Sequence, residues 1–206
     1  MAKNTKIKTP VSELIWVFIT GDGRDQSENN DGSKMQKLAS IVLKTESPAC
    51  QKLMTDINTV WEEYKAANPT KIKKATQPKS LGYKVVKDPD TDEETDETIF
   101  AFKTNSFFPD GKPNKVAVYN AKGQKIDLGE TIVGNGSRGV IHGEAAGYEF
   151  AKQYGISLYL KGVQIAKLVE GGSADIDADD ISEEGDFEAP ENGNVPEVSA
   201  DEQPDL

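Results

Sequence analysis

Cysteine and histidine are almost absent from this sequence, which contains Cys50, His142 and no other residue of either type. A single cysteine cannot form an intramolecular disulfide, so we expect a reducing compartment. A single histidine excludes a histidine cluster for zinc and leaves one candidate imidazole base. Because no nucleophile motif accompanies Cys50, we expect an ordinary packed thiol. The sequence thus predicts a protein that is not an enzyme, with no catalytic residue, no metal site and no cofactor.

A long apolar run is also missing. The N-terminal segment MAKNTKIKTP is basic, but the apolar stretch that follows it, LIWVFI, is shorter than a signal sequence or a membrane-spanning helix requires. That stretch suits a β-strand instead. We therefore expect a soluble cytoplasmic protein that does not interact with membranes.

Basic residues are absent from the last 35 residues, where 13 Asp and Glu stand without Lys or Arg. The other residues, 1–171, hold 24 basic side chains against 22 acidic ones. Seven of those 22 lie in a second acidic run, DPDTDEETDE at 88–97. A mildly basic body with two acidic segments indicates a polyanionic partner or an acidic interaction tail. The alternative is that the acidic runs only keep the chain soluble.

Hydrophobic periodicity predicts one long helix and about seven short strands. The helix covers 48–67, because Ser47 can cap its N-terminus, Pro48 fits its first turn and an Asn-Pro pair ends it. Its apolar stripe, which includes Trp61, is expected to pack in the core. The predicted strands and hairpins are 11–19, 34–44, 82–87, 98–104, 115–128, 130–143 and 155–170.

This order of elements predicts a mainly β fold. Several short strands with a helix after the second favour a small β-barrel of the oligonucleotide/oligosaccharide-binding (OB) type. We expect one domain over 1–171, in which the acidic insert at about 88–97 forms the tip of a hairpin. Residues 172–206 are expected to form a flexible, disordered acidic tail.

The segment GNGSRG at 134–139 matches the G-x-G-x-x-G pattern of dinucleotide-binding folds. In those folds the glycines follow a strand and open a helix. Here the next residues, VIHGEAAGYEF, contain two further glycines and no helical stripe. We interpret the segment as a glycine-rich strand bend that brings Arg138 and the backbone close to a ligand. An enzyme that binds a nucleotide at this segment is the alternative.

Basic and aromatic residues are interleaved along the body, a pattern typical of proteins that bind single-stranded nucleic acid. In such proteins a basic groove follows the phosphates and aromatic rings stack on bases. Phe100 and Phe102 are two residues apart on a predicted strand and would form a stacking platform on one face, unless that face lines the barrel core. The candidate DNA-binding residues are Trp16, Lys34, Lys37, Lys71, Lys73, Lys74, Lys84, Phe100, Phe102, Lys103, Phe107, Tyr119, Arg138, Tyr148 and Tyr159.

Two long segments of the chain resemble the single-stranded DNA-binding proteins of tailed bacteriophages, which have an OB-fold and an acidic C-terminal tail. The likeness is strongest in GNGSRGVIHGEAAGYEFAKQYGISLYLKGVQIAKLVEGG, with its Gly-Ser strand, its tyrosine-containing connection and its strand with a Val-Gln pair. Upstream, TIFAFKTNSFFPDGKPNKVAVYNAKGQKID resembles the Phe-x-Phe-Lys strand, glycine loop and hairpin of that family.

The resemblance implies a protein that coats and protects single-stranded DNA, without sequence preference, during phage replication, recombination or repair. Strand annealing, location in the cytoplasm of the infected bacterium and a homodimer are further expectations. The acidic tail would compete with DNA and bind phage or host replication proteins, through its last residues Asp201, Glu202, Asp205 and Leu206. The alternative function is an acidic DNA mimic that inhibits a host nucleic-acid enzyme through 88–97 and the tail.

Overall fold

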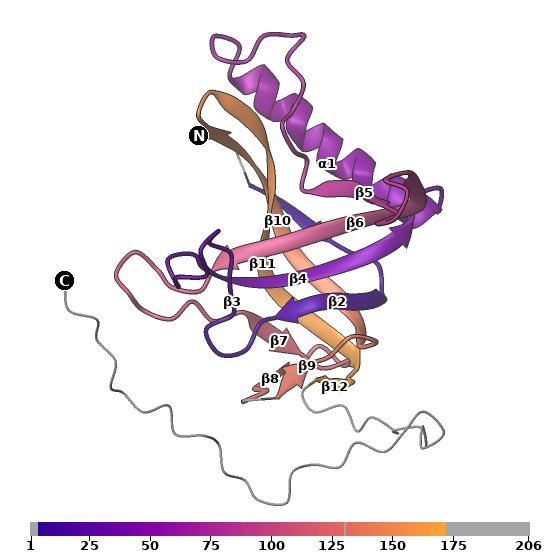
Figure 1. The fold of residues 1–206 in the computed structure, drawn as a ribbon, viewed down its shortest axis with the longest axis vertical. Helices are drawn as coiled ribbons and strands as arrows, with labels where there is room; N and C mark the ends of the chain where they lie inside the picture. The colour runs from indigo at the N-terminus through magenta and orange to yellow at the C-terminus, as the bar shows by residue number, and fades with distance from the viewer. Residues whose placement is uncertain (1–3, 130, 172–206) are drawn as a thin grey trace, which may run out of the picture. The chain divides into compact units, whose positions relative to one another are not determined.

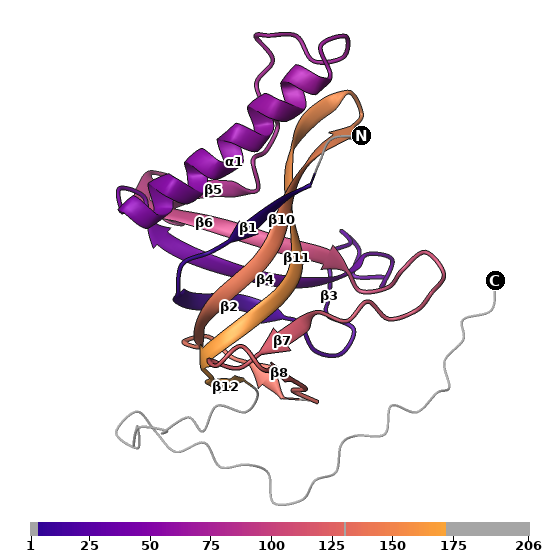
Figure 2. The same cartoon turned by 180° about the vertical axis from the view of Figure 1, so that it is seen from behind.

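Five strands of one sheet close into a β-barrel, which lies at the centre of Figures 1 and 2. The computed structural model describes residues 4–129 and 131–171. The first three barrel strands pair antiparallel in sequence order, the third runs parallel to the last, and the fourth pairs with both the last and the first. The expected mainly β, OB-like barrel is therefore confirmed. The strands are β2 (Ser12–Phe18), β4 (Met35–Lys44), β6 (Glu94–Asn105), β10 (Arg138–Phe150) and β11 (Gln153–Lys167).

Shorter strands extend this barrel at its edges and ends. The strand nearest the N-terminus lies along β10, and two others pair with β4 and β6. A further hairpin pairs with β11, and the last described residues form a separate two-stranded sheet. These strands are β1 (Thr5–Lys8), β3 (Arg24–Asp25), β5 (Tyr83–Lys87), β7 (Ala117–Tyr119), β8 (Lys125–Ile126), β9 (Ile132–Val133) and β12 (Glu170–Gly171).

The helix α1 (Pro48–Ala67) has the bounds that the sequence predicts. The Ser47 hydroxyl accepts a hydrogen bond from the backbone N–H of Cys50 at 3.2 Å, and Pro48 occupies the first turn. The buried face of the helix, which includes Trp61, belongs to the same hydrophobic core as the barrel. Burial also raises the pKa of the Cys50 thiol, as expected for a packed cysteine. No helix among the described residues is long and apolar enough to cross a membrane.

The barrel core is built from alternate residues of each strand. On β6 this inward set includes Phe100 and Phe102, whose exposed fractions are 0%. The two rings do share one face of the sheet, but that face is the interior of the barrel. The prediction that they stack on bases is therefore wrong, because no base can reach them in the folded protein.

The acidic segment 88–97 is only partly a hairpin tip. Residues 88–93 connect β5 to β6, whereas Glu94–Glu97 are already part of β6 and pair with β4 and β5. Lys44 on β4 lies 2.9 Å from a carboxylate oxygen of Asp96 and 3.4 Å from one of Glu97. Lys87 lies 2.9 Å from a carboxylate oxygen of Asp92. Several of these carboxylates are thus paired with lysines: with Lys87 of the same hairpin and with Lys44 of the neighbouring strand β4.

The glycine-rich segment 134–139 bends into strand β10, and no helix follows it. A side chain on Gly139 would place its Cβ atom 2.3 Å from the carbonyl oxygen of Gln164 on β11. The hydroxyl of Ser137 donates to the carbonyl oxygen of Val169 at 3.1 Å and accepts from the N–H of Val169 at 3.0 Å. The segment is a strand bend, as interpreted. Its glycines allow it to approach the backbone at Gln164 and Val169, whereas the sequence interpretation expected them to approach a ligand. No residue of this segment lines either of the two concave surfaces described below.

Strands β10 and β11 form a long hairpin whose end extends beyond the barrel beside α1 (Figures 1 and 2). Its turn residues Ala151 and Lys152 both have left-handed backbone conformations, with φ of 50° and 62°, as in the tight turns that match strand twist. Gly147 packs against the ring of Tyr64 on α1, because any Cβ atom there would lie 2.2 Å from that ring. The helix therefore holds the hairpin in a fixed position.

Candidate nucleic-acid interface

A groove of about 1020 Å³ crosses the outer face of β4 and β6, which lie side by side in Figure 1. Its floor contains Leu38 and Ser40 of β4 and Ala101 and Lys103 of β6. The β2–β4 loop (residues 19–34) and the β10–β11 hairpin supply its walls. OB folds bind oligonucleotides on the face of their second and third strands, between the loops that correspond to these two walls. The groove is thus the candidate interface.

Four aromatic side chains line this groove: Trp16, Tyr148, Phe150 and Tyr83, of which Tyr83 packs partly against the core. The exposed fractions are 50% for Trp16 and 76% for Phe150, and Tyr148 is half-buried. Exposed aromatic rings of this size are unfavourable in water, and flat rings are the surfaces on which bases stack. The groove therefore offers stacking positions from two separate elements, β2 and the β10–β11 hairpin.

Trp16 reaches the groove through an irregularity in β2. The pairing of β2 with β4 shifts between Ile15 and Phe18, and Trp16 has a left-handed backbone with φ of 50°. Leu14 and Val17 both point into the core, so the bulge displaces Trp16 from the inward position that simple alternation would give it. A left-handed conformation at a bulky residue costs about 1–3 kcal/mol. The fold maintains this strain while presenting the indole to the groove.

The charged residues of the groove are three cations, Arg24, Lys84 and Lys103, and two anions, Asp25 and Glu149. The guanidinium of Arg24 lies 5.2 Å from the centre of the Phe18 ring, a cation–π contact that orients it. Glu149 is ion-paired with Lys71 at 2.7 Å. Cations thus outnumber carboxylates in the groove, and Glu149 is already paired with Lys71, so the groove presents a net surplus of positive charge to a ligand.

Asp25 organises the β2–β4 loop. Its carboxylate accepts hydrogen bonds from the backbone N–H of Ser27 at 2.9 Å, the hydroxyl of Ser27 at 2.7 Å and the N–H of Gly32 at 2.6 Å. These bonds to the charged form lower the pKa of Asp25 to about 2. The carboxylate therefore fixes the loop conformation next to Arg24.

We expect Asp25→Ala to loosen this loop and to weaken binding to the groove, because three donors lose their shared acceptor. The exposed Glu28→Ala variant makes the same charge change in the same loop and should have little effect.

The loop should also depend on pH. In the wild type the pKa of Asp25 is lower in the folded state than the ordinary value of 3.8, so the carboxylate stabilises the loop fully above that value. This stabilisation should be lost as the pH falls through about 2. Hydrogen exchange of residues 26–33 at neutral pH and at a pH of about 2 measures the loop directly. Unchanged protection in Asp25→Ala would contradict the role of this carboxylate.

Four of the predicted DNA-binding residues line the groove: Trp16, Lys84, Lys103 and Tyr148. A fifth, Tyr159, is paired with Lys103 across β6 and β11 and is 38% exposed, so it lies next to the groove. These five residues come from five different strands, β2, β5, β6, β10 and β11, and the barrel brings them to one surface.

Lys37 does not belong to this surface, which corrects the prediction for it. It follows the inward phase of Ala39 and Ile41 on β4, and its exposed fraction is 5%. Burial lowers the pKa of its ammonium group, partly offset by the nearby Asp22. A phosphate in the groove cannot contact a lysine that points into the barrel.

The remaining candidates are exposed or half-buried but lie outside the groove. Lys34 is at the end of the β2–β4 loop, and Lys71, Lys73 and Lys74 are in the loop after α1, where Lys71 is engaged with Glu149. None of these four side chains lines the groove. Phe107 lies in the loop after β6, Arg138 begins β10 opposite Glu13, and Tyr119 lines a different pocket.

Sequence reasoning missed Arg24 and Phe150. Arg24 follows two glycines, and its segment has the composition of a simple connecting loop. The loop after the first OB strand is nevertheless a known binding element. Phe150 lies in AAGYEF, whose glycine obscures strand β10. The signal that could have found it is the Phe-Ala-Lys-Gln turn, since a hairpin tip exposes the side chains beside it.

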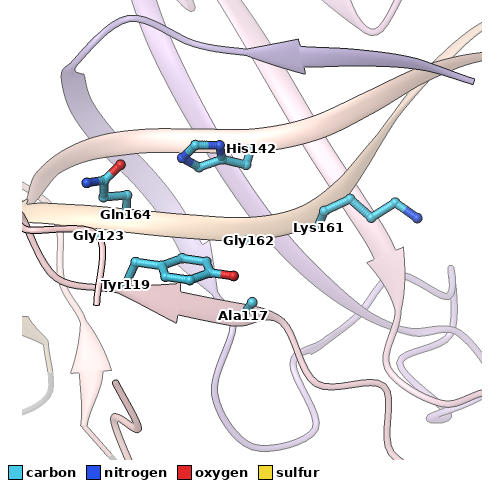
Figure 3. Close-up of a pocket in the computed structure, with 7 residues that line it drawn as sticks. All are labelled: Ala117, Tyr119, Gly123, His142, Lys161, Gly162 and Gln164. Carbon is cyan, nitrogen blue, oxygen red and sulfur yellow. The ribbon is translucent and has the colours of Figure 1, made fainter. Parts of the chain in front are cut away.

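A second, smaller pocket of about 350 Å³ lies on the outer face of β7, β10 and β11 (Figure 3). Figure 3 shows the rings of Tyr119 and His142 on either side of the β11 backbone at Gly162. The ring centres are 6.5 Å apart, and the planes are inclined by 59°. Its lining residues are Ala117, Tyr119, Gly123, His142, Lys161, Gly162 and Gln164.

Comparison with known proteins finds similar folds among solved structures. No protein-family model and no curated protein sequence matches this chain. The structure of gp2.5, a single-stranded DNA binding protein encoded by bacteriophage T7, is similar with a TM-score of 0.64 and 19% identity, over 91% of this chain and 100% of that one. The single-stranded DNA-binding protein from bacteriophage Enc34, in complex with ssDNA, is similar with a TM-score of 0.56 and 14% identity, over 84% of this chain and 95% of that one. At these identities the likeness establishes a shared fold.

Proposed function

We propose that this chain, whose fold is that of two phage single-stranded DNA-binding proteins, binds single-stranded DNA without sequence preference. The observation that carries the proposal is the groove on β4 and β6, which combines exposed aromatic rings with cations at the OB binding position. One of the two phage proteins was solved in complex with ssDNA. The proposed role is to coat and protect the strand, with no covalent chemistry.

In this proposal the bases stack and the phosphates pair with cations. Trp16, Tyr148 and Phe150 each offer a flat surface, and a stacked base contributes about 1–3 kcal/mol whatever its identity. Arg24 and Lys103 lie beside these rings in the same groove and would neutralise phosphates. A strand whose bases are held in this way cannot pair with itself, so binding would remove hairpins and keep the strand accessible for annealing.

The acidic segment 172–206, including the predicted partner-binding residues Asp201, Glu202, Asp205 and Leu206, lies outside the described residues. Its role is inferred from its composition. A flexible tail of 35 residues, which the composition predicts, would have a reach of about 30 Å, and tethering would give it an effective concentration on the order of millimolar. We propose that its 13 carboxylates compete with DNA for the cations of the groove and recruit phage or host replication proteins. The chain would act in replication or recombination in the cytoplasm of an infected bacterium.

A DNA mimic is less well supported by the arrangement of charges. A mimic needs unpaired carboxylates at its working surface, whereas Asp96 and Asp92 of the 88–97 segment are paired with Lys44 and Lys87. The cations of the groove would also have no role in such an inhibitor. The titration described next separates the two functions, because a mimic does not bind DNA.

The test is a titration of oligothymidylate into the full-length protein at several salt concentrations. Trp16 is half exposed in the groove and Trp61 is 4% exposed in the core, so stacking should quench the fluorescence of Trp16. The logarithm of the binding constant should fall linearly with the logarithm of the salt concentration. In Lys84→Gln/Lys103→Gln the slope should be smaller by about 1.4, since each phosphate contact on a single strand contributes about 0.7.

Two controls make this titration specific. Lys73→Gln/Lys74→Gln removes the same charge from exposed lysines outside the groove and should leave the slope nearly unchanged. A chain that ends at Gly171 keeps strand β12 and should bind more tightly at low salt if the acidic segment competes with DNA. Absence of binding by both chains at low salt would refute the proposed function. Equal affinities of the two chains would refute the competition alone.

A further inference from the structure

The pocket between Tyr119 and His142 has features that packing of the barrel does not require. Tyr119 and Ala117 point away from the core on β7, whereas Val118 between them is buried. Gly162 forms the pocket floor (Figure 3), and a Cβ atom there would lie 2.8 Å from the carbonyl oxygen of Ala117 and 3.4 Å from the Tyr119 ring. The glycine allows β7 to pair closely with β11 and leaves an open space between two rings.

The polar groups of this pocket have unused hydrogen-bonding capacity. The side-chain amide nitrogen of Gln164 donates to the carbonyl oxygen of Ala121 at 3.2 Å, which fixes the amide and leaves its oxygen as an acceptor. Within residues 4–129 and 131–171, neither ring nitrogen of His142 makes a hydrogen bond. Two aromatic faces with a donor and an acceptor at the edge suit a flat heterocycle. A volume of about 350 Å³ is at the small end of ligand pockets and fits one such ring.

The outer face of β11 connects this pocket with the groove. Ser157 lines the groove, Tyr159 is exposed two residues further, and Lys161 lines the pocket after another two. Because side chains alternate and each residue advances the strand by about 3.3 Å, Ser157 and Lys161 are about 13 Å apart on the same face. Lys103, which lines the groove, is paired with Tyr159. A continuous row of basic and aromatic side chains thus joins the two concave surfaces.

The carboxylate of Glu144, which lies beside this row, is already satisfied. It lies on β10 opposite Tyr159, forms an ion pair with Lys161 at 3.2 Å and accepts a hydrogen bond from the side-chain amide of Asn4 at 3.0 Å. These contacts lower the pKa of Glu144, and the hydrogen bond from Asn4 is the largest cause. The row therefore does not present an unpaired negative charge to a phosphate backbone.

We propose that the Tyr119–His142 pocket is a second base subsite, which receives one unstacked nucleobase of the strand that fills the groove. The base lies between the two rings above Gly162, its edge meets the Gln164 amide oxygen, and the phosphates between the two sites pass Lys103 and Lys161. This inference rests on the proposed function and deepens it. It predicts a binding path that leaves the β4–β6 face and continues around the barrel across β11.

The experiment compares the affinities of oligothymidylates of about 4 to 16 nucleotides, the range that single OB folds cover. The wild type should gain affinity in a step once a strand is long enough to reach from the groove to Tyr119. Tyr119→Leu keeps an apolar side chain of similar bulk over Gly162 but removes the aromatic face. It should lose about 5- to 150-fold in affinity for the long strands, the equivalent of one stacked base, and less than about 2-fold for the shortest.

Two variants and one labelled strand complete the design. Tyr119→Phe keeps the ring and should retain the step, whereas Phe108→Leu removes an exposed aromatic ring that lies in neither concave surface and should also retain it. A long strand with a single photoreactive 5-iodouracil, moved along the sequence, should crosslink to Tyr119 from one position only.

The outcomes separate this inference from the proposed function. If Tyr119→Leu loses affinity equally for all lengths, or for none, and the groove still binds DNA, then the second subsite does not exist. If the wild type binds no strand of any length, the proposed function fails and the subsite fails with it. If the gain in affinity with strand length is lost in Tyr119→Leu and retained in Tyr119→Phe, the result supports both the proposed function and the second subsite.

Discussion

Replacement of Trp16 by glycine is expected to weaken the binding of single strands by about 5- to 150-fold, the loss of one stacked base. The same change should make the folded protein more stable than Trp16→Ala by about 1 kcal/mol. Glycine adopts the left-handed conformation at this position, with its φ of 50°, without the steric penalty that alanine and tryptophan pay. Trp16→Gly would then bind single strands more weakly than the wild type and unfold less readily than Trp16→Ala.

The measurement combines fluorescence anisotropy of a labelled oligothymidylate with urea unfolding of each variant. Trp61→Phe is the matched control, because it also removes an indole but from the buried face of α1. It should reduce stability and leave the affinity of the folded protein unchanged. If Trp16→Gly binds as tightly as the wild type, the indole does not contact DNA. If it is also less stable than Trp16→Ala, the left-handed backbone is not a source of strain.

Phe102→Ala should lower the free energy of unfolding by about 3–5 kcal/mol, the usual effect of removing a large aromatic side chain from a core. The ring of Phe102 has an exposed fraction of 0% and contacts the backbone at Gly143, where a Cβ atom would lie 2.5 Å from it. The fraction of the variant that remains folded should bind oligothymidylate within about 2-fold of the wild type.

Phe150→Ala provides the opposite case. Its ring is 76% exposed at the edge of the groove, so the change should leave stability within about 0.5 kcal/mol and reduce affinity. Urea unfolding with the anisotropy titration distinguishes the two variants. A Phe102→Ala protein of wild-type stability with reduced affinity would show that Phe102 is exposed to DNA and that the barrel register described above is wrong.

The secondary structure was largely predictable because its signals are local. The helix bounds follow from the Ser47 cap, the Pro48 start and the Asn-Pro stop, none of which depends on the rest of the chain. The first two barrel strands likewise follow from their β-branched and apolar runs. Strand β10 was harder, because Gly139, Gly143 and Gly147 weaken its strand signal. Each of these glycines is required by a contact that forms only in the assembled barrel, because the backbone of another strand or an aromatic ring lies where a Cβ atom would be.

The site was less predictable than the fold, because alternation identifies two faces of a strand without telling which is inside. Phe100 and Phe102 were placed on one face correctly, and Lys37 follows the same inward phase on its neighbour β4. Alternation would place Trp16 on the inner face of β2, but a bulge turns it outward, and no local sequence signal indicates that bulge. The lysines at 71–74 form the most basic stretch of the chain, yet none of them lines the groove, and Lys71 is engaged with the groove residue Glu149. Local charge density is a poor guide where tertiary structure decides which cations converge.

The parallel pairing of β6 with β11 has a consequence for synthesis of the protein on the ribosome. The edge of β6 that receives β11 is complete at Asn105, whereas β11 begins at Gln153, so translation at about 5–20 residues per second leaves several seconds between them. An open strand edge is a site of aggregation during such an interval. Strand β5 is synthesised just before β6 and can pair with that same edge, from Glu94 to Phe100, as soon as β6 is complete. Only the end near Lys103 is then left for β11. The short strand β5 therefore covers most of the open edge of β6 in the nascent chain until β11 is synthesised.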